Sequence, residues 1–410
     1  MIEIYQEENT PVKAFLVGFE NLSELKGLVK TLGMEVGGEI LISKVKPNPQ
    51  YYLGTGKTEE IIHNVEVLDC ECIIFDFEIS PTHQRNWEKL ANIPCFDRHE
   101  VILRIFESRA ATKEATLQVQ LANLEYSLPR LAHSYGDMAR QRGGAFGSKG
   151  SGETKLELDR RKIQEKIYSI KKELEKVRKN RQTQRKQREK IPLPVCALVG
   201  YTNAGKSSLL NVLTSSDVYE KDELFATLDT STRRLSCDGK FSVLLTDTVG
   251  FIKNLPHTLV DAFRSTLEEA VISDVLLIVL DASSIDIEEN YKTTIKVLDE
   301  IGATSNKRII VLNKWDLVDS FTKIRLSELF KNAICTSTKT KEGLKDLENC
   351  IFEICMKNQI KCFVPYEDGK TISLIKRECF IIFENNKEDG IEFTLRTNTE
   401  IENLLKEYIL

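Results

Sequence analysis

A glycine-rich loop near the middle of the chain has the spacing of a phosphate-binding site. Residues 200–207 read Gly-Tyr-Thr-Asn-Ala-Gly-Lys-Ser and match the pattern G-x-x-x-x-G-K-[ST], between an apolar run and a helical pattern. The glycines allow backbone N–H groups to turn toward a β-phosphate, and the start of the helix adds partial positive charge. We expect Lys206 to bridge the β- and γ-phosphates as a catalytic group and the Ser207 hydroxyl to bind Mg²⁺.

A second phosphate-directed motif, "TDTVG", stands at the end of the apolar run "FSVLLTD". Asp247 is predicted to hold Mg²⁺ through a water molecule. The backbone N–H of Gly250 is predicted to contact the γ-phosphate and to act in catalysis.

Two motifs farther along the chain can recognise a base. In "NKWD", the Asp316 carboxylate can accept hydrogen bonds from guanine N1–H and the 2-amino group, and adenine offers neither donor. Asn313 is expected to tie this loop to the phosphate loop, and the stem of Lys314 to pack on the base. Residues 337–339, in "CTSTKTKEG", are expected to contact guanine O6 through the backbone. The four motifs in this order predict a GTP-hydrolysing domain.

The segment "LFATLDTSTRR", between the first two motifs, is expected to act as a switch loop. Thr227 is predicted to contact Mg²⁺ and the γ-phosphate and to act in catalysis, with Thr230 and Thr232 as alternatives. Loss of the γ-phosphate would then release the loop. The residues expected to line the nucleotide are Gly200, Tyr201, Thr202, Asn203, Ala204, Gly205, Lys206, Ser207, Phe225, Ala226, Thr227, Leu228, Asp229, Asp247, Thr248, Val249, Gly250, Asn313, Lys314, Trp315, Asp316, Ser337, Thr338 and Lys339.

The residue after Gly250 sets an expectation about rate. Many small GTPases carry there a glutamine that orients the attacking water, and this chain carries Phe251. A phenyl ring cannot hydrogen-bond to that water, so basal hydrolysis is expected to be slow. Asn203 indicates one compensating source, because in some GTPases an asparagine at this position helps to bind K⁺, which can take the role of an arginine finger.

A second stretch, "LGTGKTEE", resembles a phosphate loop only in part. Alignment of Gly56-Lys57-Thr58 on the pattern places Tyr51 where the upstream glycine should stand, and the preceding residues "KVKPNPQ" are interrupted by prolines. Residues 54–58 are therefore expected to form a turn that caps a following helix. A weak anion site, for RNA phosphate or a second nucleotide, stays open as the alternative.

Several kinds of element must position these motifs. Residues 1–108 alternate apolar runs with helical patterns, which predicts an α/β domain with a parallel sheet. Residues 192–357 do the same with near-continuous apolar runs, typical of parallel strands covered by helices on both faces. Residues 358–410 contain short alternating segments at 371–376, 379–385 and 391–397 and a closing helix, which predicts a small α+β domain.

Residues 109–191 have a different pattern, that of two helices in an antiparallel hairpin. Each half carries apolar residues at alternating steps of three and four, the seam of a coiled coil. These residues are Leu117, Leu121, Leu124 and Leu128 in the first half and Ile163, Ile167, Ile170, Leu174 and Val177 in the second. Between them lies a basic, glycine-rich loop at 143–152.

Charge and composition narrow the classes of partner. The 410 residues carry a net charge of −5, yet residues 155–190 contain fifteen Lys and Arg against six acidic residues. That excess favours a polyanionic partner for the arm, and the alternatives are a solvated helix face and a flexible linker. The ten cysteines show no C-x-x-C pair and the five histidines no ligand spacing, so we assign no metal cluster. The N-terminus does not read as a secretory signal, and no apolar run is long enough to span a bilayer.

With these motifs in place, the chain resembles the HflX-type GTPases, a family of ribosome-associated translational GTPases. The shared blocks cover most of residues 50–340 and include "LGTGKTEEI", "RQRGGAFGSKGSGETKLELDRRKI", "GYTNAGKSSLLNVLT", "LFATLDTSTRRL" and "DTVGFIKNLPHTLVDAFRSTLEEA". The resemblance thins over residues 345–410. The chain departs from the family at residues 149–155, where Arg-Gly-Pro-Gly-Glu-Thr-Gln is common, and at Thr338, where alanine is usual.

The resemblance implies a protein that binds the large ribosomal subunit in the GTP state and can split or rescue stalled ribosomes under stress. It also implies contact with rRNA near the peptidyl transferase centre. We expect a cytoplasmic, monomeric GTPase that requires Mg²⁺ and is stimulated by the ribosome, with rRNA contacts at Arg140, Arg142, Lys149 and Lys155. Two alternatives stay open: an RNA-binding assembly factor that GTP merely stabilises, and an enzyme with a second, ATP site in the N-terminal domain.

Overall fold

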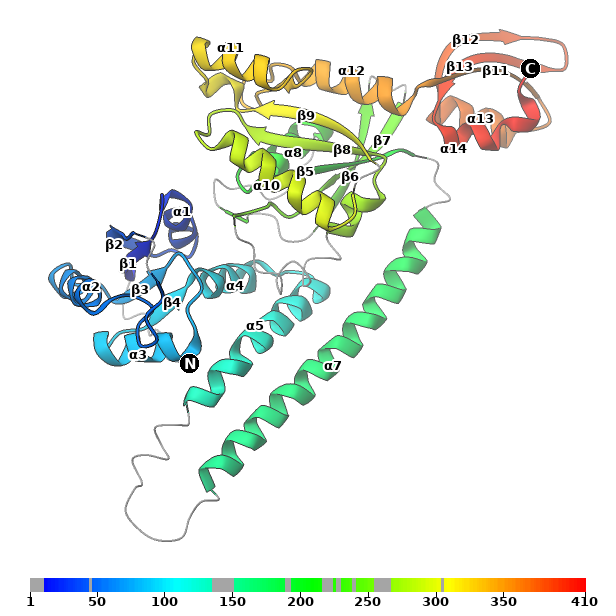
Figure 1. Ribbon diagram of the computed structural model, residues 1–410. Helices are drawn as coiled ribbons and strands as arrows, with labels where there is room; N and C mark the ends of the chain where they lie inside the picture. Colours follow the sequence, from blue (N-terminus) through cyan, green and yellow to red (C-terminus); the bar gives the residue numbers. More distant parts are fainter. Residues whose placement is uncertain are drawn as a thin grey trace. The chain divides into compact units, whose positions relative to one another are not determined.

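The chain divides into two compact units, and each is described by itself. The first contains Met1–Val177 and Leu255–Ala262, and the second contains Arg178–Asn254 and Phe263–Leu410. A computed structural model gives the elements in Figure 1. The structure describes residues 11–43, 46–134, 151–188, 193–215, 224–225, 230–237, 241–253, 267–303 and 306–410.

The N-terminal part of the first unit is a four-stranded parallel sheet in the order β2-β1-β3-β4. Its elements are β1 (Lys13–Gly18), α1 (Ser23–Thr31), β2 (Glu35–Leu41), α2 (Thr55–Val67), β3 (Cys72–Phe75), α3 (Pro81–Ala91), β4 (Cys95–Asp97) and α4 (Arg98–Arg109). One core cluster joins Phe15 of β1 and Phe75 of β3 to Ile61 of α2 and Trp87 of α3. The α/β class expected for this region is confirmed.

Helices α5 (Lys113–Ser134) and α7 (Ser151–Arg188) form the arm, and Figure 1 shows them side by side. Leu117, Ile170 and Leu174 form a buried cluster with the partly buried Leu121 and Leu124, so the predicted seam holds at these positions. The α5 helix also packs on α3 and α4, so it belongs to the same unit as the sheet.

A buried polar network secures α5 to that sheet. The Asp97 carboxylate, at the end of β4, has no solvent exposure and accepts hydrogen bonds from the Tyr126 hydroxyl (2.9 Å) and the Arg130 guanidinium (3.1 Å). Arg130 also donates to Gln84 of α3 (2.9 Å). A buried carboxylate needs such donors, because an unpaired charge inside a protein is costly.

The second unit contains a six-stranded sheet in the order β10-β9-β8-β5-β7-β6, in which only β6 runs antiparallel to its neighbour. Its elements are β5 (Val195–Gly200), α8 (Lys206–Thr214), β6 (Ser231–Cys237), β7 (Phe241–Asp247), β8 (Val275–Asp281), α10 (Ile287–Glu300), β9 (Lys307–Asn313), η1 (Trp315–Leu317), α11 (Ser320–Leu329), β10 (Ile334–Cys335) and α12 (Leu344–Cys355).

Helices cover both faces of this sheet, as the apolar runs predict. Along β5, Cys196 and Leu198 pack with α8 and α12, while Ala197 and Val199 pack with α10 and α11. Successive side chains of a strand point to opposite faces. A strand buried on both sides therefore reads as a continuous apolar run, and its carboxyl end emerges at the edge where the phosphate loop begins.

The C-terminal part is a three-stranded antiparallel sheet in the order β11-β13-β12 with two α-helices. Its elements are β11 (Asn358–Pro365), α13 (Gly369–Glu378), β12 (Phe380–Asn386), β13 (Gly390–Thr397), α14 (Thr399–Leu404) and η2 (Lys406–Tyr408). The interpretation of residues 371–376 as an alternating segment is wrong, because they lie inside α13. The Asp368 side chain caps that helix by accepting from the Thr371 N–H (3.2 Å), a signal that short alternation hides.

Candidate functional site: a nucleotide cradle at the carboxyl edge of the sheet

The phosphate loop joins β5 to α8 and depends on two glycines. Gly200 has φ +148°, and a Cβ there would lie 2.2 Å from the Val279 carbonyl oxygen of β8. Gly205 has φ +87°, and a Cβ there would lie 2.2 Å from Asn313 Nδ2. Both close approaches exclude any side chain. The loop is thereby pressed between neighbouring strands, with the N-terminus of α8 directly after it.

Lys206 occupies the first position of α8, and its ammonium is held by the loop itself. The Nζ atom donates to the carbonyl oxygens of Tyr201 (2.8 Å) and Gly200 (3.2 Å). Burial lowers the pKa of Lys206 to about 8, although the nearby Asp247 carboxylate acts in the opposite direction. A cation held in this way is ready to exchange two carbonyl partners for phosphate oxygens.

Ser207 and Asp247 are adjacent, as a shared Mg²⁺ site requires. The Ser207 hydroxyl donates to Asp247 Oδ2 at 2.6 Å, and Asp247 ends β7 with no solvent exposure. Next to it, the Thr248 hydroxyl donates to the Leu198 carbonyl (2.7 Å) and fixes the start of the "DTVG" turn. A hydroxyl and a carboxylate are hard oxygen ligands of the kind that Mg²⁺ prefers, so the residues present fit the metal.

The base-recognition loop is tied to the phosphate loop as expected. Asn313, at the end of β9, is buried and donates through Nδ2 to the Ala204 carbonyl (3.0 Å). The Asp316 carboxylate accepts from the buried Ser337 hydroxyl (2.6 Å), which orients it. The motifs at residues 200–207, 313–316 and 337–339 therefore meet at one edge of the sheet.

Asp281 contacts this loop system and was not predicted from the sequence. Lys314 has φ 59° and pairs through Nζ with Asp281 Oδ2 at 2.9 Å. Asp281 is the last residue of β8, directly after the run "VLLIVL". A polar residue at the carboxyl end of a buried parallel strand is the signal that could have found it.

Part of the predicted site falls outside the described residues. Phe225 is buried, but Ala226, Thr227, Leu228 and Asp229 lie beyond the described part of the chain. Of the two alternatives, Thr232 lies on β6, where its hydroxyl contacts that of Thr246 (3.0 Å). Arg140, Arg142 and Lys149 also lie outside the described residues, and Lys155 is described only as backbone of α7.

The loop "GTGKT" has a different structure from the phosphate loop. Gly54 is the N-cap of α2, and its carbonyl accepts from both the N–H and the hydroxyl of Thr58 (3.0 Å each). Lys57 pairs with Glu60 (2.9 Å), and the isolated bridge between Asn48 and Tyr52 precedes the loop in place of a strand. The prediction of a helix-capping turn is confirmed.

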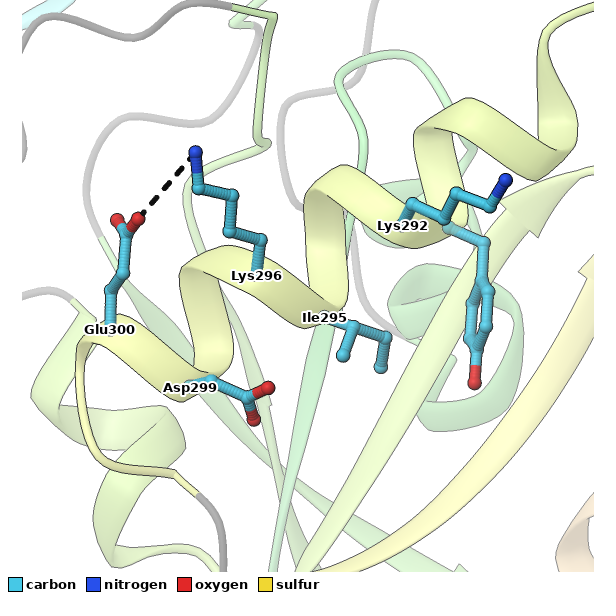
Figure 2. Close-up of a pocket in the computed structure, with 6 residues that line it drawn as sticks. Lys292, Ile295, Lys296, Asp299 and Glu300 are labelled. Carbon is cyan, nitrogen blue, oxygen red and sulfur yellow. Dashed lines mark ion pairs between the residues drawn. The ribbon is translucent and has the colours of Figure 1, made fainter.

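A shallow hollow elsewhere on the same domain does not coincide with the cradle. Figure 2 shows it on α10, where Lys296 pairs with Glu300 (3.9 Å). The residues that line it are Tyr291, Lys292, Ile295, Lys296, Asp299 and Glu300. None of them belongs to a predicted GTP motif, so the hollow adds nothing to the nucleotide site.

Comparisons with known proteins agree with this geometry. Three family models match: "GTP-binding GTPase N-terminal" over residues 19–107, "GTP-binding GTPase Middle Region" over 109–188 and "50S ribosome-binding GTPase" over 195–314. The chain is 42% identical to the GTPase HflX of Caldanaerobacter subterraneus, over 95% of this chain and 90% of that protein. It is 40% identical to the GTPase HflX of Escherichia coli, over 90% and 88%.

Among solved structures, a GTP-binding protein from Sulfolobus solfataricus in complex with GDP is 26% identical to the chain. It matches over 84% of this chain and 98% of that chain with a TM-score of 0.46. In the described part of this chain, no helix has the length and apolar character needed to cross a membrane.

Proposed function

The chain belongs to the HflX family of GTPases, and from this premise we propose that GTP is bound and hydrolysed in the cradle at residues 200–207, 247–250, 313–316 and 337–339. The convergence of Lys206, of the Ser207–Asp247 pair and of the Asp316–Ser337 pair at one sheet edge carries the assignment. Ser207 and Asp247 would hold Mg²⁺, which supplies charge neutralisation at the phosphates. Thr227 is proposed as the switch threonine.

Replacing the lysine of each glycine-lysine loop in turn tests this assignment and distinguishes it from the alternative of a second, ATP site in the N-terminal domain. Lys206→Ala should abolish measurable binding of fluorescent GDP, whereas Lys57→Ala in the helix-capping turn should leave it unchanged. Both substitutions remove a lysine that follows Gly-x-Gly or Ala-Gly at the start of a helix, so they are matched. Loss of ATP binding in the Lys57→Ala chain would instead support an ATP site in the N-terminal domain.

We propose further that the protein is a cytoplasmic, monomeric switch that acts on the large ribosomal subunit. It matches a family described as 50S ribosome-binding GTPases. The basic arm at residues 109–191 is proposed to reach rRNA through its glycine-rich loop, because only small residues allow the backbone to approach phosphates closely. Splitting or rescue of stalled ribosomes is the role that we propose for GTP-driven binding.

Co-sedimentation with separated ribosomal subunits tests the arm. Replacing Arg140, Arg142, Lys149 and Lys155 by alanine should weaken binding to large subunits and should lower the slope of log affinity against log salt by up to about 3. GDP affinity should stay unchanged. Replacing the exposed Lys361 and Lys370 of the C-terminal domain is the control. Equal salt slopes in the arm variant and the wild-type chain would contradict the proposal.

Hydrolysis measured beside binding distinguishes a switch from an assembly factor. We expect large subunits to raise the GTPase rate, and we expect a hydrolysis-deficient chain to stay on them. Full biological activity of a hydrolysis-deficient chain would favour the assembly factor instead.

We also propose that K⁺ assists hydrolysis through Asn203. This residue lies in the phosphate loop between Gly200 and Gly205 and adopts φ 60°. Turnover should be faster in K⁺ than in Na⁺ at equal ionic strength, and Asn203→Ala should remove the difference. Equal turnover of the wild-type chain in both salts would contradict this proposal.

A further inference from the structure

A short zipper of hydrogen bonds joins the phosphate loop to the residues that follow Gly250. The Phe251 N–H donates to the Gly200 carbonyl (3.0 Å), and the Thr202 N–H donates to the Phe251 carbonyl (2.8 Å). The third bond is different, because the Lys253 N–H donates to the side-chain hydroxyl of Tyr201 (2.7 Å). A single hydroxyl group therefore determines whether the zipper extends to Lys253.

Tyr201 presents that hydroxyl from a fixed position. The residue is only 8% exposed and packs in the same core cluster as Phe251 and Leu280. Phe251 is buried as well, so the side chain that replaces a water-orienting glutamine anchors the backbone in the core. The ammonium of Lys253 pairs with Glu289 of α10 (2.7 Å), which adds a weaker tie on the surface.

The zipper restrains the position of Gly250, because the backbone is attached to neighbouring elements both before and after this residue. On its N-terminal side, the Thr248 hydroxyl is bonded to the Leu198 carbonyl of β5. At Gly250 itself, a Cβ would lie 2.8 Å from Thr202 Cα and 2.9 Å from Lys206 Nζ. On its C-terminal side, the zipper to the phosphate loop begins directly. The Gly250 N–H can therefore shift only if the attachment at Thr248 or the attachment at Phe251 loosens.

We propose that Tyr201 is a positioning residue for GTP hydrolysis. Its hydroxyl keeps the Gly250 N–H directed at the place of the γ-phosphate. The proposal rests on GTP being hydrolysed in this cradle. Donors fixed in advance stabilise developing charge without reorganisation, and small displacements weaken them. Since Phe251 offers no hydrogen bond to water, this chain depends more on such backbone donors.

The substitution Tyr201→Phe tests the hydroxyl alone, because the ring and its packing stay. Tyr291→Phe is the matched control: Tyr291 lies on α10 of the same domain, and its ring packs on Phe330 away from the phosphate loop. Each full-length chain is assayed for single-turnover GTP hydrolysis, for affinity to fluorescent GDP and a non-hydrolysable GTP analogue, and for hydrogen exchange of the Lys253 amide.

For Tyr201→Phe we expect hydrolysis to slow by about 3- to 10-fold, the effect of one lost hydrogen bond. Both nucleotide affinities should stay within about twofold, and the Lys253 amide should exchange faster while β8 amides keep their protection. Tyr291→Phe should match the wild-type chain throughout. A Tyr201→Phe chain that hydrolyses GTP at the wild-type rate overturns the inference, as does an equal loss of nucleotide affinity. Failure of the wild-type chain to hydrolyse GTP would instead overturn the proposed function.

Discussion

Raising the pH should weaken guanine-nucleotide binding through one buried lysine. Lys206 is only 6% exposed, and its ammonium donates to two backbone carbonyls, which carry only partial charges. Burial lowers its pKa from 10.5 to about 8, and the charge of Asp247 offsets this only in part. The phosphates of a bound nucleotide favour the ammonium form and raise the pKa again. Above pH 8, binding must therefore be accompanied by uptake of a proton.

The size of the effect follows from the pKa of the unbound form. With a pKa of about 8, about nine tenths of the lysine is charged at pH 7 and about one tenth at pH 9. The dissociation constant for GDP should therefore rise about tenfold between these values, which is about 1.4 kcal/mol. Below pH 7 the constant should change little from this source, because the lysine is already charged.

Fluorescent GDP titrations at constant ionic strength measure the trend, and calorimetry in two buffers of different ionisation enthalpy counts the protons. Lys206→Arg is the control, since a guanidinium stays charged over the whole range. Any loss of the guanine N1 proton in the alkaline part affects both chains equally. A proton count of zero for the wild-type chain at pH 8.5 would falsify the reasoning.

Three further substitutions follow from the geometry. Ser337→Ala removes the 2.6 Å hydrogen bond that orients Asp316 and should lower GDP affinity by about 3- to 10-fold in titrations, with xanthosine diphosphate affected less. Gly250→Ala places a Cβ 2.8 Å from Thr202 Cα and should slow single-turnover hydrolysis at least tenfold, a loss that Gly369→Ala in open space should not cause. Asp97→Asn removes the buried carboxylate that pairs with the partly buried Arg130 guanidinium and should destabilise the first unit by about 3 kcal/mol, measured as lost hydrogen-exchange protection in α5 with protection in α8 retained.

The sequence predicted the six-stranded sheet of the second unit and its loops well because each signal there is local. A strand buried on both faces reads as an apolar run, and a phosphate loop requires glycines at fixed offsets. Asp247 and Asn313 each stand at the end of such a run, Asp316 follows Asn313 closely in η1, and parallel strands bring their carboxyl ends to one edge. Distant residues could therefore be assigned to a single site without any contact information.

Other features depend on partners far along the chain and left no such signal. The strand β4 has three residues, too few for a pattern, and is defined by pairing with β3. Tyr201 reads as one variable position of a phosphate loop, and only the fold shows its hydroxyl bonded to Lys253. Residues 371–376 alternate over too short a span to separate a strand from a helix, so the alternation does not reveal α13.

The two glycine-lysine loops of this chain show why spacing alone does not define a phosphate site. Lys57 keeps a side-chain exposure of 35% and pairs with Glu60, and a Cβ at Gly54 or Gly56 would meet nothing within 4 Å. Lys206 is buried, and a Cβ at Gly200 or Gly205 would collide with a neighbouring strand end. Backbone N–H groups bind phosphate well only when the fold has already fixed their direction, because otherwise ordering them costs conformational entropy on binding. The strand before the loop supplies that fixation at Gly200, and its absence before Gly54 leaves a turn that caps a helix.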